Sequence, residues 1–261
     1  MTTNAASAQT EGTADPIARL QEFVAAGGYL DDRSHQPIAG NILTTEIDFL
    51  YATVRKHGFR NCLDIGVAKG VSYAAMAAGI AANGEGNLWG IDPDQSTDHS
   101  HSATRLCAAL DLPCNGVIES KTLYATAEIR EKVGQLKGGQ LDFVFVDGWH
   151  TFDTTLIDFL LADDLVRPGG IVGFHDCYYP SKLKVLRYAR RHRDYRMLPD
   201  MARPRFNSAM RLARALRNAA RLRWNALSLT YWRFNLGTDS SIILMQKKSD
   251  QKPPYSFHRP F

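Results

Sequence analysis

Short apolar runs alternate with helix-length segments along most of this chain. Each run is continuous rather than alternating with polar residues, which is typical of strands buried on both faces of a parallel sheet. Ligands of such sheets bind beyond the carboxyl ends of the strands, so the residues that follow each run are candidates for function. The predicted strands are Asn61–Ile65, Asn87–Asp92, Cys114–Ser120, Leu141–Asp147 and Gly170–Asp176, with a final candidate at 240–248.

Helical periodicity fills the segments around these strands. We expect a turn at Arg167–Gly170, because Pro and Gly break the preceding helix there. Gly58 is expected to end the helix before the first strand. The predicted helices are 17–27, 44–58, 71–83, 102–112, 126–136 and 152–166.

The composition is that of an ordinary globular protein. With 261 residues, 44% of them hydrophobic and 22% charged, the chain can fill one sizeable core. The four cysteines form no CxxC pair, which favours a reducing compartment. The polar N-terminus lacks the apolar core of a signal peptide, so we expect a cytoplasmic protein. We predict a disordered tail at 1–15, one domain at 16–250 and a C-terminal tail at 251–261.

The first two strands end in residues that suit a nucleoside ligand. Asp64, Gly66, Gly70 and Ser72 form the turn after the first strand, where glycines permit close approach of the backbone to a ligand. Asp92 ends the second strand, at the position where nucleotide-binding folds hold ribose hydroxyls. Alone, the glycine turn is equally well explained as an ordinary strand-to-helix turn, and Asp92 is better explained as a solvated loop acid. Together they favour an adenosine-type ligand.

The last two parallel strands end in acids and histidines. Asp147 and Asp176 directly follow apolar runs, and His150 and His175 lie close to them in the sequence. Because adjacent strands end at the same edge of a sheet, these four side chains are expected to meet. Such a cluster suits either a hard cation or general-base catalysis.

The order of these motifs resembles class I S-adenosylmethionine-dependent methyltransferases. The similarity rests on LDIGVAKGVS, GIDPD, LDFVFVDGWH and DLVRPGGIVGFHD, which together span about 61–176. Within that class the chain resembles small-molecule O-methyltransferases, a group that includes macrolide-sugar, cephalosporin-pathway and catechol enzymes. The resemblance implies an α/β fold: a Rossmann-like, doubly wound, mostly parallel seven-stranded sheet with N-terminal helices and a C-terminal helical insertion.

The resemblance also implies a role for each motif residue. Asp64, Gly66 and Gly70 would cradle the methionine part of S-adenosylmethionine, and Ser72 would touch its carboxylate. Asp92 would hold the ribose. The remaining expected cofactor contacts are Ser120 for adenine, and Gly148 and Trp149 beside the adenosine.

By the same resemblance, His150 is the catalytic base, and the metal ligands are Asp147, His175 and Asp176. One position departs from the metal-dependent pattern, because several of those relatives have an acid where this chain has His175. Magnesium prefers oxygen ligands, so this departure weakens the case for it. Magnesium, a softer divalent ion and no metal all remain open.

A basic segment, Arg203–Leu227, precedes the final strand candidate. It lies within an expected helical insertion at 200–230 and has apolar residues on one side and arginines on another. A lid over the acceptor pocket, a peripheral membrane contact and a plain surface helix all fit this pattern. No recognised module indicates nucleic-acid binding.

We therefore expect a methyltransferase that acts on a hydroxyl of a small molecule, such as a sugar or a glycosylated secondary metabolite. A homo-oligomer is compatible with the sequence. An NAD-type oxidoreductase is the alternative enzyme, and it is disfavoured because the glycine turn lacks GxGxxG. A non-catalytic membrane- or partner-binding protein that retains the fold is the other alternative. The acceptor is not encoded in any recognisable motif.

Overall fold

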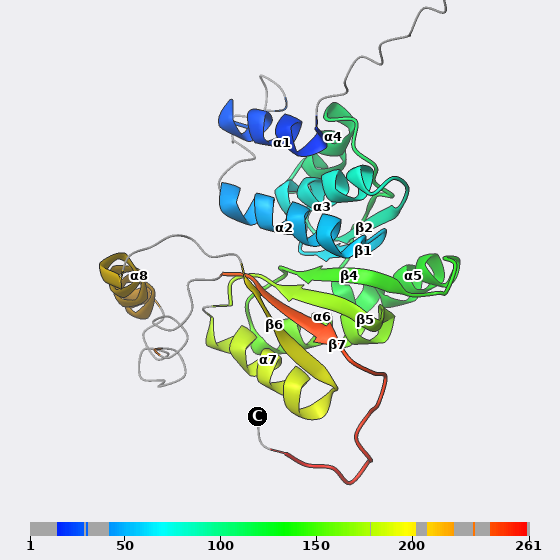
Figure 1. Ribbon diagram of the computed structural model, residues 1–261, viewed down its shortest axis with the longest axis vertical. Helices are drawn as coiled ribbons and strands as arrows, with labels where there is room; N and C mark the ends of the chain where they lie inside the picture. The colour runs from blue at the N-terminus through cyan, green and yellow to red at the C-terminus, as the bar shows by residue number, and fades with distance from the viewer. Residues whose placement is uncertain are drawn as a thin grey trace, which may run out of the picture.

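The computed structural model describes residues 15–28, 30, 42–177, 179–201, 208–221, 232 and 241–259. Of the tail expected at 1–15, all but Asp15 lies outside these residues. The described part of the expected C-terminal tail, 251–259, contains no helix or strand. Within the described residues, one sheet of seven strands runs through the molecule (Figure 1).

The sheet has the order β3-β2-β1-β4-β5-β7-β6. The first five strands of this order are parallel, and β7 pairs antiparallel with both β5 and β6. The chain therefore proceeds outward from β1 to β3 and then resumes at β4 on the other side of β1. Ligands of doubly wound sheets bind at this switch in direction. The strands are β1 Asn61–Ile65, β2 Asn87–Ile91, β3 Val117–Ile118, β4 Leu141–Val146, β5 Val166–Phe174, β6 Tyr195–Met201 and β7 Ile243–Lys247.

Helices cover both faces of the sheet. Figure 1 shows α1 to α4 above it and α6 and α7 below it, and the predicted Rossmann-like α/β class is confirmed. The helices are α1 Pro16–Ala25, α2 Thr44–His57, α3 Val71–Ala82, α4 Ser102–Ala109, α5 Thr122–Gly134, α6 Phe152–Leu165, α7 Pro180–His192 and α8 Ser208–Arg221.

The strands divide their side chains between two apolar layers. On β4, Phe143 and Phe145 pack toward α1 to α4, whereas Val144 and Val146 pack toward α5 to α7. Successive side chains of a strand point to opposite faces, which is why a continuous apolar run is needed to fill both layers. The central strands are consequently rigid supports for the polar residues that follow them.

Two strand predictions were inaccurate. β3 has only two residues rather than the predicted seven, and the expected turn Arg167–Gly170 lies inside β5. The pairing of β4 with β5 shifts register there. Gly169 adopts a φ of 83°, and Arg167 Nε donates to Asp142 Oδ1 at 2.7 Å. The glycine therefore makes an irregularity within the strand rather than a loop before it. The sequence pattern had not located β6 or α7.

The basic segment is helical over Ser208–Arg221, and the rest of 203–227 lies outside the described residues. Ala215 and Ala219 are buried, whereas Met210 and Leu216, which belong to the predicted apolar side, are about half exposed. The predicted apolar side is thus not the buried side. In Figure 1 α8 lies at the left, away from the sheet. No helix in the described part of the chain is long and apolar enough to cross a membrane.

Candidate active site

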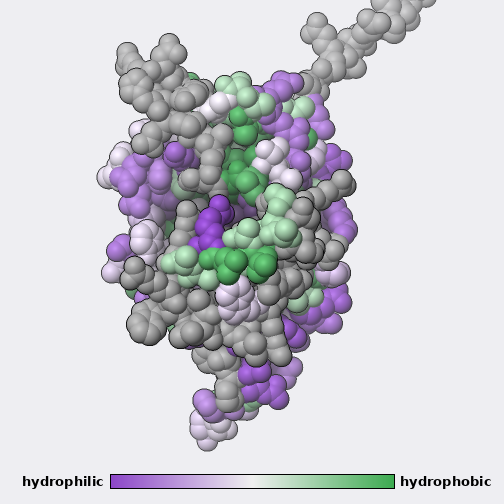
Figure 2. Space-filling model, turned by 90° about the vertical axis from the view of Figure 1, so that its left-hand side faces the viewer, coloured by the Kyte–Doolittle hydropathy of each residue, from purple (hydrophilic) through white to green (hydrophobic). Residues whose placement is uncertain are grey.

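The carboxyl ends of the parallel strands surround a pocket of about 620 Å³. They lie on the side of the molecule that Figure 2 shows, where hydrophilic side chains lie beside a band of hydrophobic ones. Loops after β1, β2, β3 and β4 all contribute to the pocket wall. Its lining includes Ile65, Gly66, Ile91, Pro93, Asp94, Ser120, Lys121, Leu123, Tyr124, Gly148, Trp149, Thr151 and Asp158.

Gly66 brings the first loop against the fourth. It has a φ of 87°, and a Cβ atom at this position would lie 2.5 Å from the backbone of Asp147 and Gly148. Only glycine permits both this conformation and this approach. The amide of Asp147 also donates to the Ile65 carbonyl at 2.8 Å. The turn after β1 and the turn after β4 therefore form one continuous wall.

Asp64 lies behind this wall, fully buried at the end of β1. Its Oδ2 accepts a hydrogen bond from Ser72 Oγ at 2.7 Å, and its Oδ1 has no partner among the described residues. Burial raises the pKa of the Asp64 carboxyl well above its ordinary value, although the bond from Ser72 lowers it. Ser72 therefore holds Asp64 in place behind the wall, and Oδ1 stays buried without a hydrogen-bond partner among the described residues.

Asp92 fixes the same loop from the second strand. Its Oδ2 accepts from the Ala68 amide at 2.7 Å, and its Oδ1 accepts from the Asp94 amide at 2.9 Å. Ala68 has a positive φ of 45°, a conformation that costs energy for a residue with a Cβ atom. The carboxylate of Asp92 thus stabilises the strained loop, and Asp94 rather than Asp92 is among the pocket-lining residues.

Of the expected cofactor residues, Gly66, Ser120, Gly148 and Trp149 line the pocket. The other four support the wall from behind. Gly70 begins α3 with a φ of 91°, and a Cβ there would collide with Ala103. The supporting residues are Asp64, Gly70, Ser72 and Asp92.

His150 lines a second pocket, of about 690 Å³, next to the first. Trp149 and Thr151 border both pockets, and the Trp149 side chain is exposed. The His150 ring meets the Tyr179 ring edge-on, with 4.7 Å between centroids. Its Nδ1 lies 3.0 Å from the Gly148 carbonyl, to which it donates.

The other ring nitrogen of His150 contacts an acid two residues after the end of β5. Nε2 lies 2.5 Å from Asp176 Oδ2, which makes a tight ion pair or a shared-proton hydrogen bond. Asp176 itself has a φ of 52°. This backbone conformation is uncommon for a residue with a Cβ atom, and residues of this kind concentrate at functional sites.

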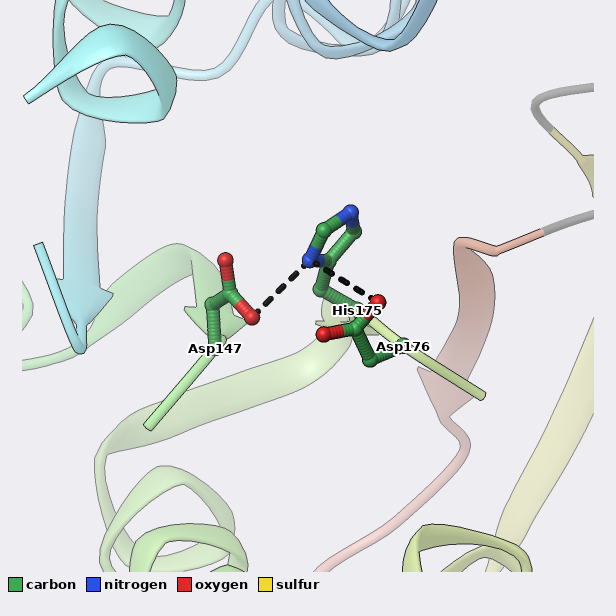
Figure 3. A group of neighbouring side chains, drawn as sticks. All are labelled: Asp147, His175 and Asp176. Carbon is green, nitrogen blue, oxygen red and sulfur yellow. Dashed lines mark hydrogen bonds and ion pairs between the residues drawn. The ribbon is translucent and has the colours of Figure 1, made fainter. Parts of the chain in front are cut away.

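The three expected metal ligands do come together. One ligand atom of each of Asp147, His175 and Asp176 lies within 4.8 Å of the others. Figure 3 shows the His175 ring between the two carboxylates, with Nδ1 2.9 Å from Asp147 Oδ1 and 3.8 Å from Asp176 Oδ1. The second ring nitrogen of His175, Nε2, lies 3.4 Å from Glu46 of α2.

Burial lowers the pKa of His175, but the surrounding carboxylates more than reverse this effect. The charge of Asp147, the hydrogen bond to it, and the Glu46 carboxylate all favour the protonated ring. The net result is a pKa well above the ordinary value of histidine. His175 therefore acts as an internal cation between acids.

Three charged residues of this region were missed from the sequence: Glu46, Asp158 and Lys182. All three are buried. Each lies on the apolar stripe of a helix, as Lys182 does with Val185, Leu186 and Ala189 of α7. A charged residue at a position where the helical period requires an apolar one was the available signal.

The family comparison gives this geometry a chemical context. Residues 63–177 match a family model described as a methyltransferase domain. The central part of the chain is therefore similar to a methyltransferase domain. The predicted resemblance to class I methyltransferases and the prediction of an enzyme are thereby confirmed.

Solved structures of similar fold match more of the chain than residues 63–177. Cofactor-bound Rv0187 from MTB shares 14% identity, with 89% of this chain and 90% of that chain covered and a TM-score of 0.59. The O-methyltransferase TomG from Streptomyces achromogenes, in complex with SAM, shares 14% over 92% of each chain, with a TM-score of 0.55. An O-methyltransferase from Bacillus cereus, in complex with SAH, shares 17% over 92% and 94%, with a TM-score of 0.54. No curated protein sequence matches this chain. At these identities the likeness establishes the fold.

Proposed function

We propose that this methyltransferase transfers the methyl group of S-adenosylmethionine to a hydroxyl of a small molecule, such as a sugar or a glycosylated secondary metabolite. The observation that carries the proposal is the meeting of two pockets at Trp149 and Thr151. The first pocket lies at the strand switch, where this fold binds nucleoside ligands. The second holds His150, which can serve an acceptor.

We assign the contacts with S-adenosylmethionine to the first pocket. Gly66 is assigned to the methionine part, with Asp64 and Ser72 supporting the wall behind it, Ser120 to the adenine, and Gly148 and Trp149 to the adenosine. Asp92 is assigned to the ribose, with Asp94 as the neighbouring carboxylate that lines the pocket. The SAM and SAH complexes of two structurally similar O-methyltransferases support this choice of cofactor.

Methyl transfer requires the acceptor oxygen, the methyl carbon and the sulfur to be nearly collinear, so positioning supplies much of the rate. The acceptor must also lose its proton during attack. His150 Nε2 is assigned as the base. Because Asp176 occupies Nε2 in the structure, the incoming hydroxyl must replace this contact, and the proton shared with Asp176 must first leave to solvent so that Nε2 can accept the proton of the hydroxyl. The Gly148 carbonyl then holds the ring through Nδ1, and the nearby Asp176 stabilises the imidazolium that forms.

A divalent metal fits this site poorly. The donor set offers two carboxylates and one imidazole, and magnesium prefers oxygen ligands. His175 Nδ1 already bonds Asp147, and the ammonium of Lys182 lies 3.8 Å from the same carboxylate oxygen. A bound ion would therefore have to displace the imidazole and lie beside a like charge. No step of the proposed reaction uses a metal.

Transfer of a labelled methyl group tests the proposal. The protein is incubated with labelled S-adenosylmethionine and a panel of hydroxylated sugars and glycosides, and methylated products are identified by mass spectrometry. His150→Ala should lower the rate by about 100- to 10,000-fold, the usual contribution of a general base. His258→Ala, in the exposed C-terminal segment, is the control and should leave it unchanged. An unchanged rate in His150→Ala would remove the base assignment.

A separate binding experiment tests the cofactor. Calorimetric titration should show S-adenosylmethionine binding and no NAD binding. Binding of NAD instead would revive the oxidoreductase alternative.

A further inference from the structure

Asp147 and Asp176, which together with His175 form the acidic cluster, each have a nitrogen partner from the chain. Asp147 Oδ1 lies 2.9 Å from His175 Nδ1, and Asp176 Oδ2 lies 2.5 Å from His150 Nε2. Partly buried carboxylates need such partners, because an unpaired charge is strongly unfavourable away from water. The cluster is thus compensated by side chains that the fold itself supplies.

Lys182 adds a further cation to this cluster. Its side chain is 0% exposed, and its Nζ lies 3.8 Å from Asp147 Oδ1. Within the described part of the chain, Nζ has no hydrogen-bond partner. A buried ammonium without hydrogen bonds is costly, and the features that offset this cost are charges rather than hydrogen bonds. The buried Asp158 carboxyl also interacts with this ammonium.

The position of Lys182 bears on metal binding through simple electrostatics. A divalent ion bound to Asp147 and the Lys182 ammonium would compete for the same carboxylate oxygen. Like charges repel strongly at separations of a few ångströms where water is largely excluded. The arrangement in which Lys182 pairs with Asp147 therefore excludes the ion on electrostatic grounds.

We propose that Lys182 takes the place of a divalent cation beside Asp147, so that the acidic cluster of this methyltransferase binds no metal. Lys182 is a positioning residue in this account, because it holds the charge of Asp147 and need not touch the acceptor. The consequence that methyl transfer is metal-independent rests on the proposed function. The proposal that the cluster binds no cation does not rest on it, and it can be tested without any methyl acceptor.

The test is a calorimetric titration of Mn²⁺ into the full-length protein after removal of bound metal with a chelator. Three proteins are compared: wild type, Lys182→Met and Lys247→Met. Methionine is close to lysine in length and has no charge. Lys247 is the matched control, because it is also a buried lysine but pairs with Asp163 and Asp250, away from the acidic cluster. Circular dichroism verifies that each variant is folded.

Wild type and Lys247→Met should show no saturable binding of Mn²⁺. Lys182→Met should bind Mn²⁺ saturably, with an affinity at least roughly a hundredfold above the upper limit that the wild-type titration sets, because the competing charge is gone. Adding Asp147→Asn to Lys182→Met should abolish that binding. If Lys182→Met is folded and still binds no Mn²⁺, the proposal is overturned.

The wild-type titration does not depend on any variant. Saturable Mn²⁺ binding by wild type that Asp147→Asn abolishes would also overturn the proposal. Either result would leave the assignment of S-adenosylmethionine and a hydroxyl acceptor untouched, because those assignments are tested by cofactor binding and by the labelled product.

Discussion

Two buried lysines of this protein are satisfied in different ways. Lys247 of β7 donates to the carbonyls of Asp163 and Val166 at 2.6 and 2.9 Å, and its Nζ lies 2.5 Å from Asp250 Oδ1. Lys182 of α7 has no hydrogen bond among the described residues and faces Asp147 at 3.8 Å. The first joins β7 to the end of α6. The second adds charge at the site without joining elements through hydrogen bonds.

This comparison distinguishes a buried charge that stabilises the fold from a buried charge that acts on the site. A buried ion that is fully hydrogen-bonded becomes part of the framework, and its removal leaves several polar groups without partners. A buried ion with only a charge partner contributes little to stability, because its desolvation offsets most of the attraction. We therefore expect the same substitution to destabilise the protein much more at Lys247 than at Lys182.

The largest expected effect on stability is that of Lys247→Met. Removal of the ammonium leaves the mostly buried Asp163 with fewer partners and takes one donor from each of two carbonyls. The free energy of unfolding should fall by about 3–5 kcal/mol, as for other broken buried ion pairs. Urea denaturation followed by circular dichroism measures it. A loss below about 1 kcal/mol would show that Lys247 is not structural in this sense.

The next effect concerns the acid that interacts with Lys182. Burial raises the pKa of Asp158 to about 6, although a hydrogen bond from Thr122 and the charge of Lys182 lower it. The folded state therefore holds this proton more tightly than the unfolded state. The stability that the proton contributes is present at low pH and is lost as pH rises through about 4 to 6.

Asp158→Asn should remove this pH dependence. Relative to the variant, wild type should lose up to about 3 kcal/mol between pH 4 and pH 7, since each unit of pKa shift corresponds to about 1.4 kcal/mol. Urea denaturation of both proteins at the two pH values is the measurement. Parallel pH profiles for wild type and variant would contradict the raised pKa.

A smaller effect is expected from Gly66→Ala. The positive φ alone costs a residue with a Cβ about 1–2 kcal/mol, and here the Cβ would also press on the backbone of Asp147. Cofactor binding should weaken with stability, because the wall of the pocket moves. Gly58→Ala is the control: its φ is also positive, but nothing lies within 4 Å of the added Cβ. Equal cofactor affinities for the two variants would show that the close approach is unimportant.

The smallest stability change should come from Lys182→Met. Loss of the attraction to Asp147 is offset by relief of an ammonium buried without hydrogen bonds, so the change should stay within about 1 kcal/mol. The same urea experiment used for Lys247→Met provides the direct comparison. A loss as large as that of Lys247→Met would mean that Lys182 is a structural residue like Lys247.

The sequence predicted the central part of the fold because one pattern determines it. Asn61–Ile65 was located to the residue, because this short and mostly buried run lies between the helix-ending Gly58 and the turn at Gly66. β3 was overestimated because its few pairing residues depend on β2 rather than on any pattern of its own. The turn expected at Arg167–Gly170 became part of β5, because pairing with β4 continues past a glycine irregularity.

The site was predicted as far as it lies at strand ends. Asp147, His150, His175 and Asp176 do meet, because parallel strands bring their carboxyl ends to one edge. Glu46 and Lys182 come from helices that pack across the sheet, and strand-end reasoning does not consider them. Both carry charges close to the cluster, Glu46 at 3.4 Å from His175 and Lys182 at 3.8 Å from Asp147, and our proposal about metal binding depends on them.

Methyl transfer in the absence of metal tests the central claim most directly. Chelator-treated wild type is given labelled S-adenosylmethionine and a hydroxylated acceptor found in the panel, with and without added Mg²⁺ or Mn²⁺. The account predicts the same rate of label transfer in all three conditions. A rate that falls about tenfold or more after chelation and returns with the divalent ion would contradict it, since that change equals about 1.4 kcal/mol of transition-state stabilisation by the metal.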